Sequence, residues 1–312
     1  MVYAFDPELA AAIEMLPNVD ITDIVKARAE FEELRAQLPA ADTTGLTITD
    51  LTVPAPGGAP DIPLRIYVPD RPSGPVGIYD VHGGGFVLGS IQMMHAGNAA
   101  LARETGAVVV SVDYRLAPEH PYPAGLEDCY TGLVWFAEHA AEYGVDPDRI
   151  AIHGISAGGG LCAGLALLAR DRGGPSIAFQ YLGVPEVDDR LDTPSMRRFT
   201  DTPMWNQPKA VISWDAYLGV GVPGSPDVPV YAAPARATDL AGLPPAFVSA
   251  MEFDPLRDES IGYALALQAA GVQVELHVYP GTFHGSSLVE HAAVTKREKE
   301  EAVTVLRKAL RV

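Results

Sequence analysis

The stretch RIAIHGISAGGGLCAGLALLAR, residues 149–170, combines the features that decide the fold. Residues 149–154 form a short apolar run typical of a buried strand, and residues 157–170 form a longer run typical of a helix. Between them lies the pattern G-x-S-x-G, with Ser156 at its centre. In a strand–turn–helix setting this pattern holds a serine in a strained backbone conformation, with its hydroxyl clear of the sheet. Ser156 is therefore our candidate nucleophile; the alternative is a serine that only caps the helix.

Apolar strands and helical segments alternate along the chain around this stretch. Strands are predicted at residues 62–68, 76–81, 107–112, 149–154, 177–183, 246–251 and 272–279. Helices are predicted at residues 94–105, 125–143, 157–170, 258–270 and 290–310. Strands separated by helices of this length imply right-handed crossovers and a mostly parallel sheet with helices on both faces. The sequence therefore predicts an α/β fold.

A second glycine-rich segment, HGGGF at residues 82–86, also follows directly after a predicted strand. Three consecutive glycines let the chain turn so that backbone N–H groups point at one spot. Fixed donors of this kind stabilise the oxyanion that develops when a nucleophile attacks a carbonyl group. A phosphate-binding glycine loop is the alternative, but neither G-x-G-x-x-G nor G-K-[ST] follows. We expect His82 to orient this loop rather than to transfer protons.

A serine nucleophile needs a base, and the base needs an orienting carboxylate. Of the eight histidines, His284 is the best candidate, because it lies in a glycine-flanked loop just beyond a predicted strand. Asp254 also lies in a loop after a strand, where Pro255 restricts the turn, and Glu252 is the alternative acid. The resulting order, Ser156 then Asp254 then His284, is the order found in α/β-hydrolases. All three follow strands, so we expect them to meet at the carboxyl edge of one sheet.

Composition limits the classes of partner. The 312 residues include 22 basic and 40 acidic side chains, a formal net charge of −18. Phosphate backbones and anionic membrane surfaces would repel such a chain, so we expect no nucleic acid partner. The two cysteines, Cys129 and Cys162, are too few for a disulfide scaffold. The N-terminus does not resemble a signal peptide and no apolar run reaches about 18 residues, so we predict a cytoplasmic protein with no membrane span.

Two segments do not fit the alternation of strands and helices. Residues 1–45 read as helix before any strand, and residues 187–225 contain proline, aspartate and tryptophan around one helical piece. Each is too short to build a core of its own. We therefore expect the two segments to pack together over the sheet as a helical cap, with residues 46–186 and 226–312 forming the catalytic domain.

Large side chains in and near these segments are candidates to line a substrate pocket. The main candidates are Met93, Trp205 and Trp214, with Met94, Phe199 and Met204 as further members of the set. The alternative is that they only join the cap to the sheet, since methionine and aromatic residues usually belong to the core. The sequence favours neither alternative.

Together these motifs resemble those of the bacterial hormone-sensitive-lipase-like esterases, a family of α/β-hydrolases. The matching stretches are HGGGF at 82–86, DYRLAPEHPYPA at 113–124, GISAGGGL at 154–161, GLPPAFVSAMEFDPLRDE at 242–259 and YPGTFHG at 279–285. The resemblance covers about residues 60–310 and implies a helical cap made from the N-terminus and a later insertion. One departure is Ile155, which stands where the family usually has aspartate, so hydrogen bonding and polarity at that position differ from the family's.

The resemblance implies a serine carboxylesterase acting on short- to medium-chain acyl esters, with no metal or organic cofactor. The oxyanion donors would be the backbone N–H groups of Gly84, Gly85 and Ala157. An amidase or lactonase with the same triad is the enzymatic alternative, and a hydrolase-fold receptor that binds without turnover is the non-enzymatic one. The expected partner is a small ester molecule, and an exposed sheet edge would also allow a homodimer.

Overall fold

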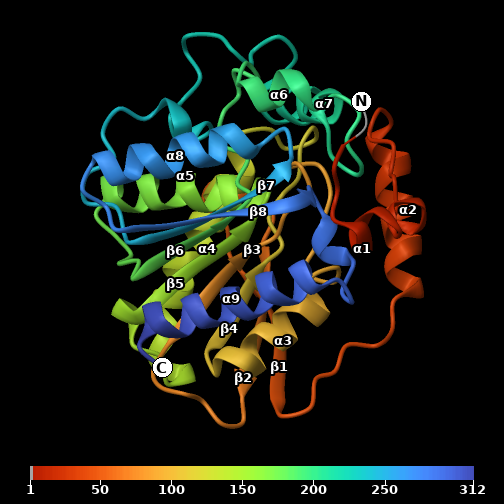
Figure 1. The fold of residues 1–312 in the computed structure, drawn as a ribbon. Coiled ribbons are helices and arrows are strands. Elements are labelled where there is room, and N and C mark those ends of the chain that lie inside the picture. Colours follow the sequence, from red (N-terminus) through yellow and green to blue (C-terminus); the bar gives the residue numbers. More distant parts are fainter. Residues whose placement is uncertain (1–2) are drawn as a thin grey trace.

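The computed structural model describes residues 3–312, so the first two residues of the expected cap lie outside the described part. Within it the chain forms an eight-stranded sheet in the order β1-β2-β4-β3-β5-β6-β7-β8 (Figure 1). β2 pairs antiparallel with β1 and β4, and all other neighbouring strands are parallel. The strands are β1 (Leu46–Val53), β2 (Ile62–Pro69), β3 (Gly77–Val81), β4 (Val108–Val112), β5 (Ile150–Ile155), β6 (Phe179–Gly183), β7 (Ala246–Phe253) and β8 (Val274–Phe283). The predicted α/β fold is confirmed.

The central strands are buried because helices cover both faces of the sheet. Every residue of β3, β4 and β6 is buried. β5 is buried except for its last residue, Ile155, which is 40% exposed. Continuous apolar runs are what parallel strands need when both of their faces are covered. The exposed end of β5 marks the carboxyl edge of the sheet, where the chain turns into the next helix.

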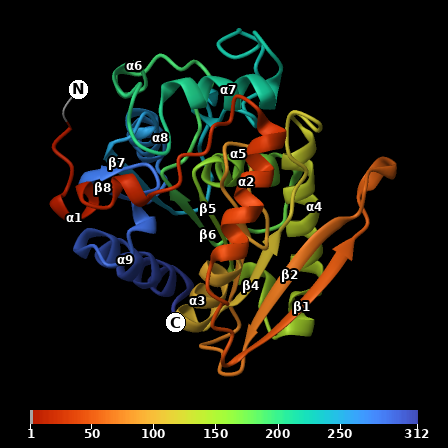
Figure 2. The same ribbon diagram turned by 90° about the vertical axis from the view of Figure 1, so that its right-hand side faces the viewer.

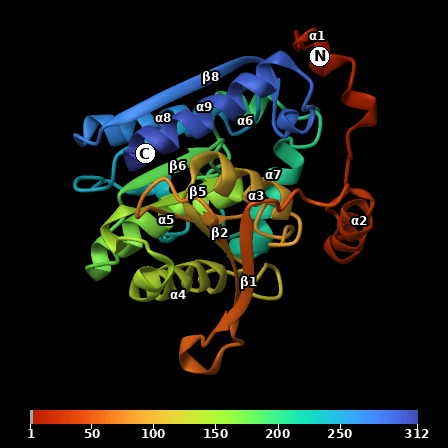
Figure 3. The ribbon, with the colours of Figure 1, turned by 90° about the horizontal axis from the view of Figure 1, so that it is seen from below.

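Five long helices form the layers on the two faces. They are α3 (His95–Thr105), α4 (Ala124–His139), α5 (Ala157–Arg172), α8 (Arg257–Ala269) and α9 (Ala293–Leu310). α3 and α9 lie side by side on one face, and α4 and α5 lie on the other (Figure 3). Buried side chains of α8 join the same core as those of α4 and α5. In the described part of the chain, no helix has both the length and the apolar character needed to cross a membrane.

The two segments outside this alternation contact each other over the sheet. Their helices are α1 (Pro7–Ala10), α2 (Ile24–Gln37), α6 (Pro194–Arg198) and α7 (Gln207–Leu218). Figure 1 shows α6 and α7 above the strands with α2 along the flank, and Figure 2 shows the chain before α2 passing beside α7. Lys209 Nζ donates to the Asn18 side-chain oxygen at 3.0 Å, and Ile21 and Trp205 share one apolar cluster. Side chains of both segments thus hold them together.

Two elements differ from the sequence-based expectation. The first predicted strand begins at residue 62, whereas the structure has β1 before it. β1 is an edge strand with several exposed polar residues, so it lacks the apolar run of a buried strand. One of these residues, Asp50, forms an ion pair with Arg65 of the neighbouring β2 at 2.6 Å. From the sequence, residues 1–45 are expected to be helical, but before α2 the described part of this segment contains only the short α1 and a 3-10 turn at Ile13–Met15. Leu9 of α1 packs into an apolar cluster with residues of β8. Tertiary contacts of this kind outweigh the local preference for a longer helix.

Candidate active site

Ser156 lies in the turn between β5 and α5 with a backbone φ of 61°. Residues other than glycine rarely adopt this left-handed region, and they keep it only where their surroundings hold it. The Ser156 N–H donates to the Gly183 carbonyl at 2.8 Å, which ties the turn to β6. A Cβ at Gly154 would overlap the Gly158 carbonyl, and a Cβ at Gly158 would overlap the Val81 carbonyl. The glycine spacing of the motif therefore follows from crowding at this turn.

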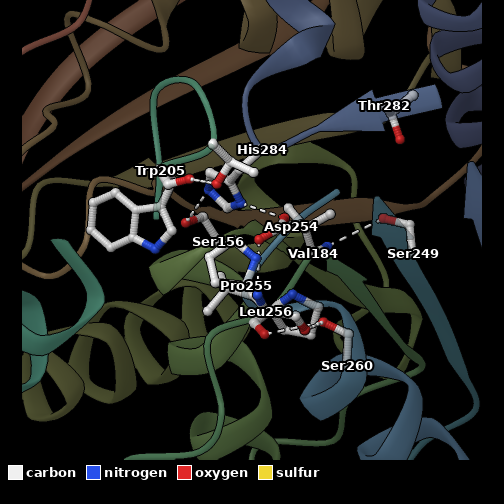
Figure 4. Close-up of polar contacts among 12 residues, drawn as sticks. Ser156, Val184, Trp205, Ser249, Asp254, Pro255, Leu256, Ser260, Thr282 and His284 are labelled. Atoms are coloured by element: carbon white, nitrogen blue, oxygen red, sulfur yellow. Dashed lines mark hydrogen bonds and ion pairs between the residues drawn. The ribbon is translucent and has the colours of Figure 1, made fainter. Parts of the chain in front are cut away.

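The structure brings Ser156, His284 and Asp254 into one hydrogen-bonded line (Figure 4). His284 Nδ1 lies 2.7 Å from Asp254 Oδ2, and His284 Nε2 lies 2.9 Å from the Ser156 hydroxyl oxygen. Asp254 is fully buried, and its Oδ1 accepts the Leu256 N–H at 2.9 Å. When Nδ1–H donates to Asp254, Nε2 is free to accept the serine proton. This arrangement can activate a serine hydroxyl for attack on a carbonyl carbon.

The alternative acid and a second histidine near the site have partners elsewhere. Glu252 accepts the Gly281 N–H at 2.7 Å. His153, on β5, lies 2.7 Å from Asp80 Oδ1, and the other oxygen of this buried carboxylate accepts from Asn98 of α3 at 2.8 Å. That pair therefore belongs to the face of the sheet covered by α3. Asp254 is the carboxylate that the structure places against His284.

The glycine loop after β3 provides backbone donors beside Ser156. Its φ angles are 125° at Gly84 and 58° at Gly85, conformations that glycine adopts without the strain a side chain would add. Within residues 3–312, the N–H groups of Gly84, Gly85 and Ala157 donate to no protein acceptor. Gly84 and Gly85 line the same cavity as Ser156, and Ala157 is the next residue along the chain. The three N–H groups are therefore available to bind an oxyanion.

His82 and Tyr114 support this loop. His82 Nδ1 lies 2.8 Å from the Gly83 carbonyl oxygen, and burial lowers the pKa of His82, which favours a neutral ring that donates from Nδ1. The ring stacks on Tyr114 with centroids 4.2 Å apart. The Tyr114 hydroxyl donates to the His82 carbonyl at 2.9 Å. These contacts give a structural role to one residue of the tract at 113–124. The sequence alone does not show this role, because His82, the partner of Tyr114, lies on another loop.

Ser156 and His284 open into a cavity of about 160 Å³. Its walls are mostly apolar and come from both the sheet and the two overlying segments. The lining residues are Pro17, Val19, Ile21, Phe31, Gly84, Gly85, Leu88, Ser156, Met204, Trp205, Lys209 and His284. The Trp205 ring lies 5.9 Å from the His284 ring, centroid to centroid. An apolar cavity beside Ser156 can hold one arm of a small substrate.

Two candidate pocket residues are not among those lining this cavity. Trp214 is fully buried, and its ring packs against Phe86 at 5.3 Å and Tyr217 at 6.0 Å, so it joins α7 to the glycine loop. Met93 lies in the turn before α3, where its N–H donates to the Ser90 hydroxyl at 3.3 Å. Of the three main candidates, the cavity is lined by Trp205 alone.

The sequence analysis missed the N-terminal lining residues and Lys209. Phe31 and Ile21 come from a helical pattern far from the motifs, and nothing local indicates that they reach the nucleophile. Lys209 Nζ donates to the Met204 carbonyl at 2.7 Å as well as to Asn18, and partial burial lowers its pKa. In the described residues, no group of three or more His, Cys, Asp or Glu side chains is placed to hold a metal ion.

The fold and the serine turn define the class of protein as an α/β hydrolase. A family model described as alpha/beta hydrolase fold matches residues 78–288. The carboxylesterase NlhH of Mycobacterium tuberculosis is 44% identical over 289 residues, which are 90% of this chain and 88% of that protein. Ethyl acetate hydrolase of Pseudomonas putida is 30% identical over 307 residues, or 93% of this chain and 95% of that one.

A solved structure agrees with these relatives. The bacterial heroin esterase has 50% sequence identity and a TM-score of 0.94, and the match covers 99% of both chains. The chain belongs to the hormone-sensitive-lipase-like carboxylesterases of the α/β-hydrolase fold. The resemblance seen in the sequence motifs, and the enzyme class that it implies, are confirmed.

Proposed function

We propose that this carboxylesterase works through Ser156 as nucleophile, His284 as general base and acid, and Asp254 as the carboxylate that orients the imidazole. The observation that carries the proposal is the line of contacts at 2.9 and 2.7 Å from the serine hydroxyl to the buried carboxylate. Ser156 attacks the ester carbonyl carbon while His284 Nε2 takes its proton. His284 then gives that proton to the leaving alcohol oxygen, and an acyl-enzyme remains.

Water completes the cycle by the same steps in reverse. His284 takes a proton from the water, the resulting hydroxide attacks the acyl carbon, and the Ser156 oxygen leaves with the proton from His284. In both halves, the oxyanion of the tetrahedral intermediate accepts hydrogen bonds from the backbone N–H groups of Gly84, Gly85 and Ala157. Fixed donors stabilise this charge without reorganising during the reaction.

The preferred substrates in this proposal are esters with short to medium acyl chains. Pockets for drug-sized ligands occupy about 300–1,000 Å³, and the cavity beside Ser156 is smaller, at about 160 Å³. Its lining is mainly apolar, as an acyl chain requires. The name of one relative, ethyl acetate hydrolase, points in the same direction. The expected cytoplasmic location and the homodimer stay predictions.

Hydrolysis of p-nitrophenyl esters from acetate to palmitate tests the proposal, with Ser156→Ala measured beside the wild type. We expect turnover to be highest with short and medium chains and to vanish in the variant, while thermal unfolding stays the same. Ser73→Ala is the control, because this exposed serine lies near Gly106, at the opposite edge of the sheet.

Other outcomes separate the alternatives. Turnover that persists in Ser156→Ala would contradict the nucleophile assignment. A folded wild type that hydrolyses amides or lactones but no simple ester would favour the amidase or lactonase alternative. Binding of an ester without any turnover would favour the receptor.

A further inference from the structure

Glu186 is a fully buried carboxyl group that the triad does not use. It lies just after β6, and its backbone N–H donates to the Ser156 carbonyl at 3.2 Å. Its Oε1 lies 3.2 Å from the Ser213 hydroxyl oxygen of α7, whereas its Oε2 has no hydrogen-bond partner in the described part of the chain. Buried polar atoms without partners are rare and need an explanation. Glu186 thus contacts the nucleophile turn with its backbone and a helix above the sheet with its side chain.

Ser213 connects Glu186 to the glycine loop. Its hydroxyl oxygen lies 2.9 Å from the Gly85 carbonyl oxygen and 3.2 Å from Glu186 Oε1. A hydroxyl carries one proton, and a carbonyl oxygen can only accept. With an ionised Glu186 the Ser213 hydroxyl would have to share its one proton between both acceptors in a weaker, bifurcated bond. With a protonated Glu186 each contact is a full hydrogen bond, because Oε1–H donates to Ser213 and the Ser213 hydroxyl donates to Gly85. The positions of the three oxygens therefore favour a neutral carboxylic acid at Glu186.

We propose that protonated Glu186 and Ser213 are positioning residues for the oxyanion hole, in which the acid orients the Ser213 hydroxyl and this hydroxyl holds the Gly85 carbonyl. The inference rests on the proposed function, because Gly85 is an oxyanion donor only there. A hydrogen bond to the Gly85 carbonyl restricts how the peptide planes of the glycine loop can rotate. The positive φ angles of this loop persist only where neighbouring groups hold them. α7 holds the next residue too, since the Phe86 and Tyr217 rings stack at 4.1 Å.

The surroundings of Glu186 agree with a neutral acid. Burial raises its pKa to about 8, the contact with Ser213 lowers the pKa, and the charge of Asp254 raises it. Among the described residues, Glu259 of α8 also lies near it, and burial raises the pKa of Glu259 well above its usual range. Both neighbours are acidic, and neither favours the carboxylate form. Above about pH 8, an ionised Glu186 would compete with Gly85 for the single Ser213 proton.

Ser213→Ala tests the link to the loop. We expect kcat to fall about 10- to 100-fold with KM changed less than twofold, a smaller loss than the ~10²–10³ caused by removing an oxyanion donor itself. Thr105→Val is the matched control, because it removes another buried hydroxyl, at the C-terminal end of α3 beside the amino end of β4. Wild-type kcat in Ser213→Ala would overturn the proposal.

Glu186→Gln tests the role of the proton. The amide still donates to Ser213 but cannot ionise, so we expect most of the kcat to be retained at pH 7. In the wild type we expect kcat to decline above about pH 8, and in Glu186→Gln this decline should disappear. The same alkaline decline in both proteins would overturn the proposal. Failure of the proposed function would look different, because esters would not be turned over by the wild type or would still be turned over by Ser156→Ala.

Discussion

The cavity beside Ser156 has two sides, which we call its floor and its roof, and different kinds of contact stabilise them. The floor consists of Ser156, Asp254, His284 and the glycine loop, each of which follows a strand of the sheet. Main-chain N–H groups hold the triad part of the floor, as when the Ser156 N–H donates to the Gly183 carbonyl and the Leu256 N–H donates to Asp254. Side chains support the glycine loop as well, since the Ser213 hydroxyl contacts the Gly85 carbonyl. The roof consists of the lining residues from the N-terminal segment and from residues 187–225.

Side chains hold the roof in place. Lys209 joins Asn18 to α7, and the Arg28 guanidinium of α2 donates to the Val87 carbonyl at 2.8 Å and pairs with Glu119 at 2.9 Å. A frame of backbone hydrogen bonds keeps reacting atoms within the narrow distances that chemistry needs. Side-chain contacts tolerate change more readily. We therefore expect floor variants to lower kcat and roof variants to alter substrate choice and KM.

Among the variants that compare the floor with the roof, the largest effect is expected for Asp254→Asn. Asparagine would favour the wrong imidazole tautomer, and the corresponding change in a serine protease lowers kcat about 10⁴-fold. Turnover of p-nitrophenyl acetate measures the loss. Glu252→Gln is the matched control and should change kcat less than threefold, because Glu252 bonds to Gly281 instead. If the Glu252 variant were the inactive one, the assignment of the acid would be wrong.

An intermediate effect is expected for Trp205→Ala in the roof. Removing the indole enlarges the cavity beside His284, so the preferred acyl chain should lengthen while kcat/KM for p-nitrophenyl acetate falls about tenfold. This factor corresponds to about 1.4 kcal/mol of lost transition-state binding. Trp214→Phe is the comparison variant, because Trp214 is buried outside the cavity lining. A shift in chain preference in Trp214→Phe, or none in Trp205→Ala, would contradict the proposed wall.

The smallest effect is expected for Lys209→Met. The variant keeps the apolar stem but loses the donors to Asn18 and Met204, so KM should rise two- to fivefold with kcat unchanged. Faster hydrogen exchange in residues 17–23 would show that the N-terminal segment has loosened. Lys26→Met, at an exposed position on α2, is the control. An unchanged KM together with faster exchange would mean that this part of the roof does not act on the substrate.

The floor could be predicted from the sequence because its elements are local. Ser156 lies within a short motif between a strand and a helix, and Asp254 and His284 each come just after an apolar strand. The edge strand β1 was missed because strands at an edge do not need an apolar run. The sequence could not decide between a pocket and a core position for Trp214, because a large apolar side chain looks the same in both settings.

The sequence by itself determined the fold class and the family and led to the proposed order of the triad, since short motifs and alternating apolar runs depend on residues that are neighbours in the chain. Tertiary structure alone decided which distant groups meet. Ser213 reaches the Gly85 carbonyl across 128 positions, and Tyr114 reaches the His82 carbonyl across 32. A serine or tyrosine hydroxyl can donate and accept hydrogen bonds at any position in a sequence. The sequence therefore does not identify its partner, which is set only when folding places an acceptor within about 3 Å.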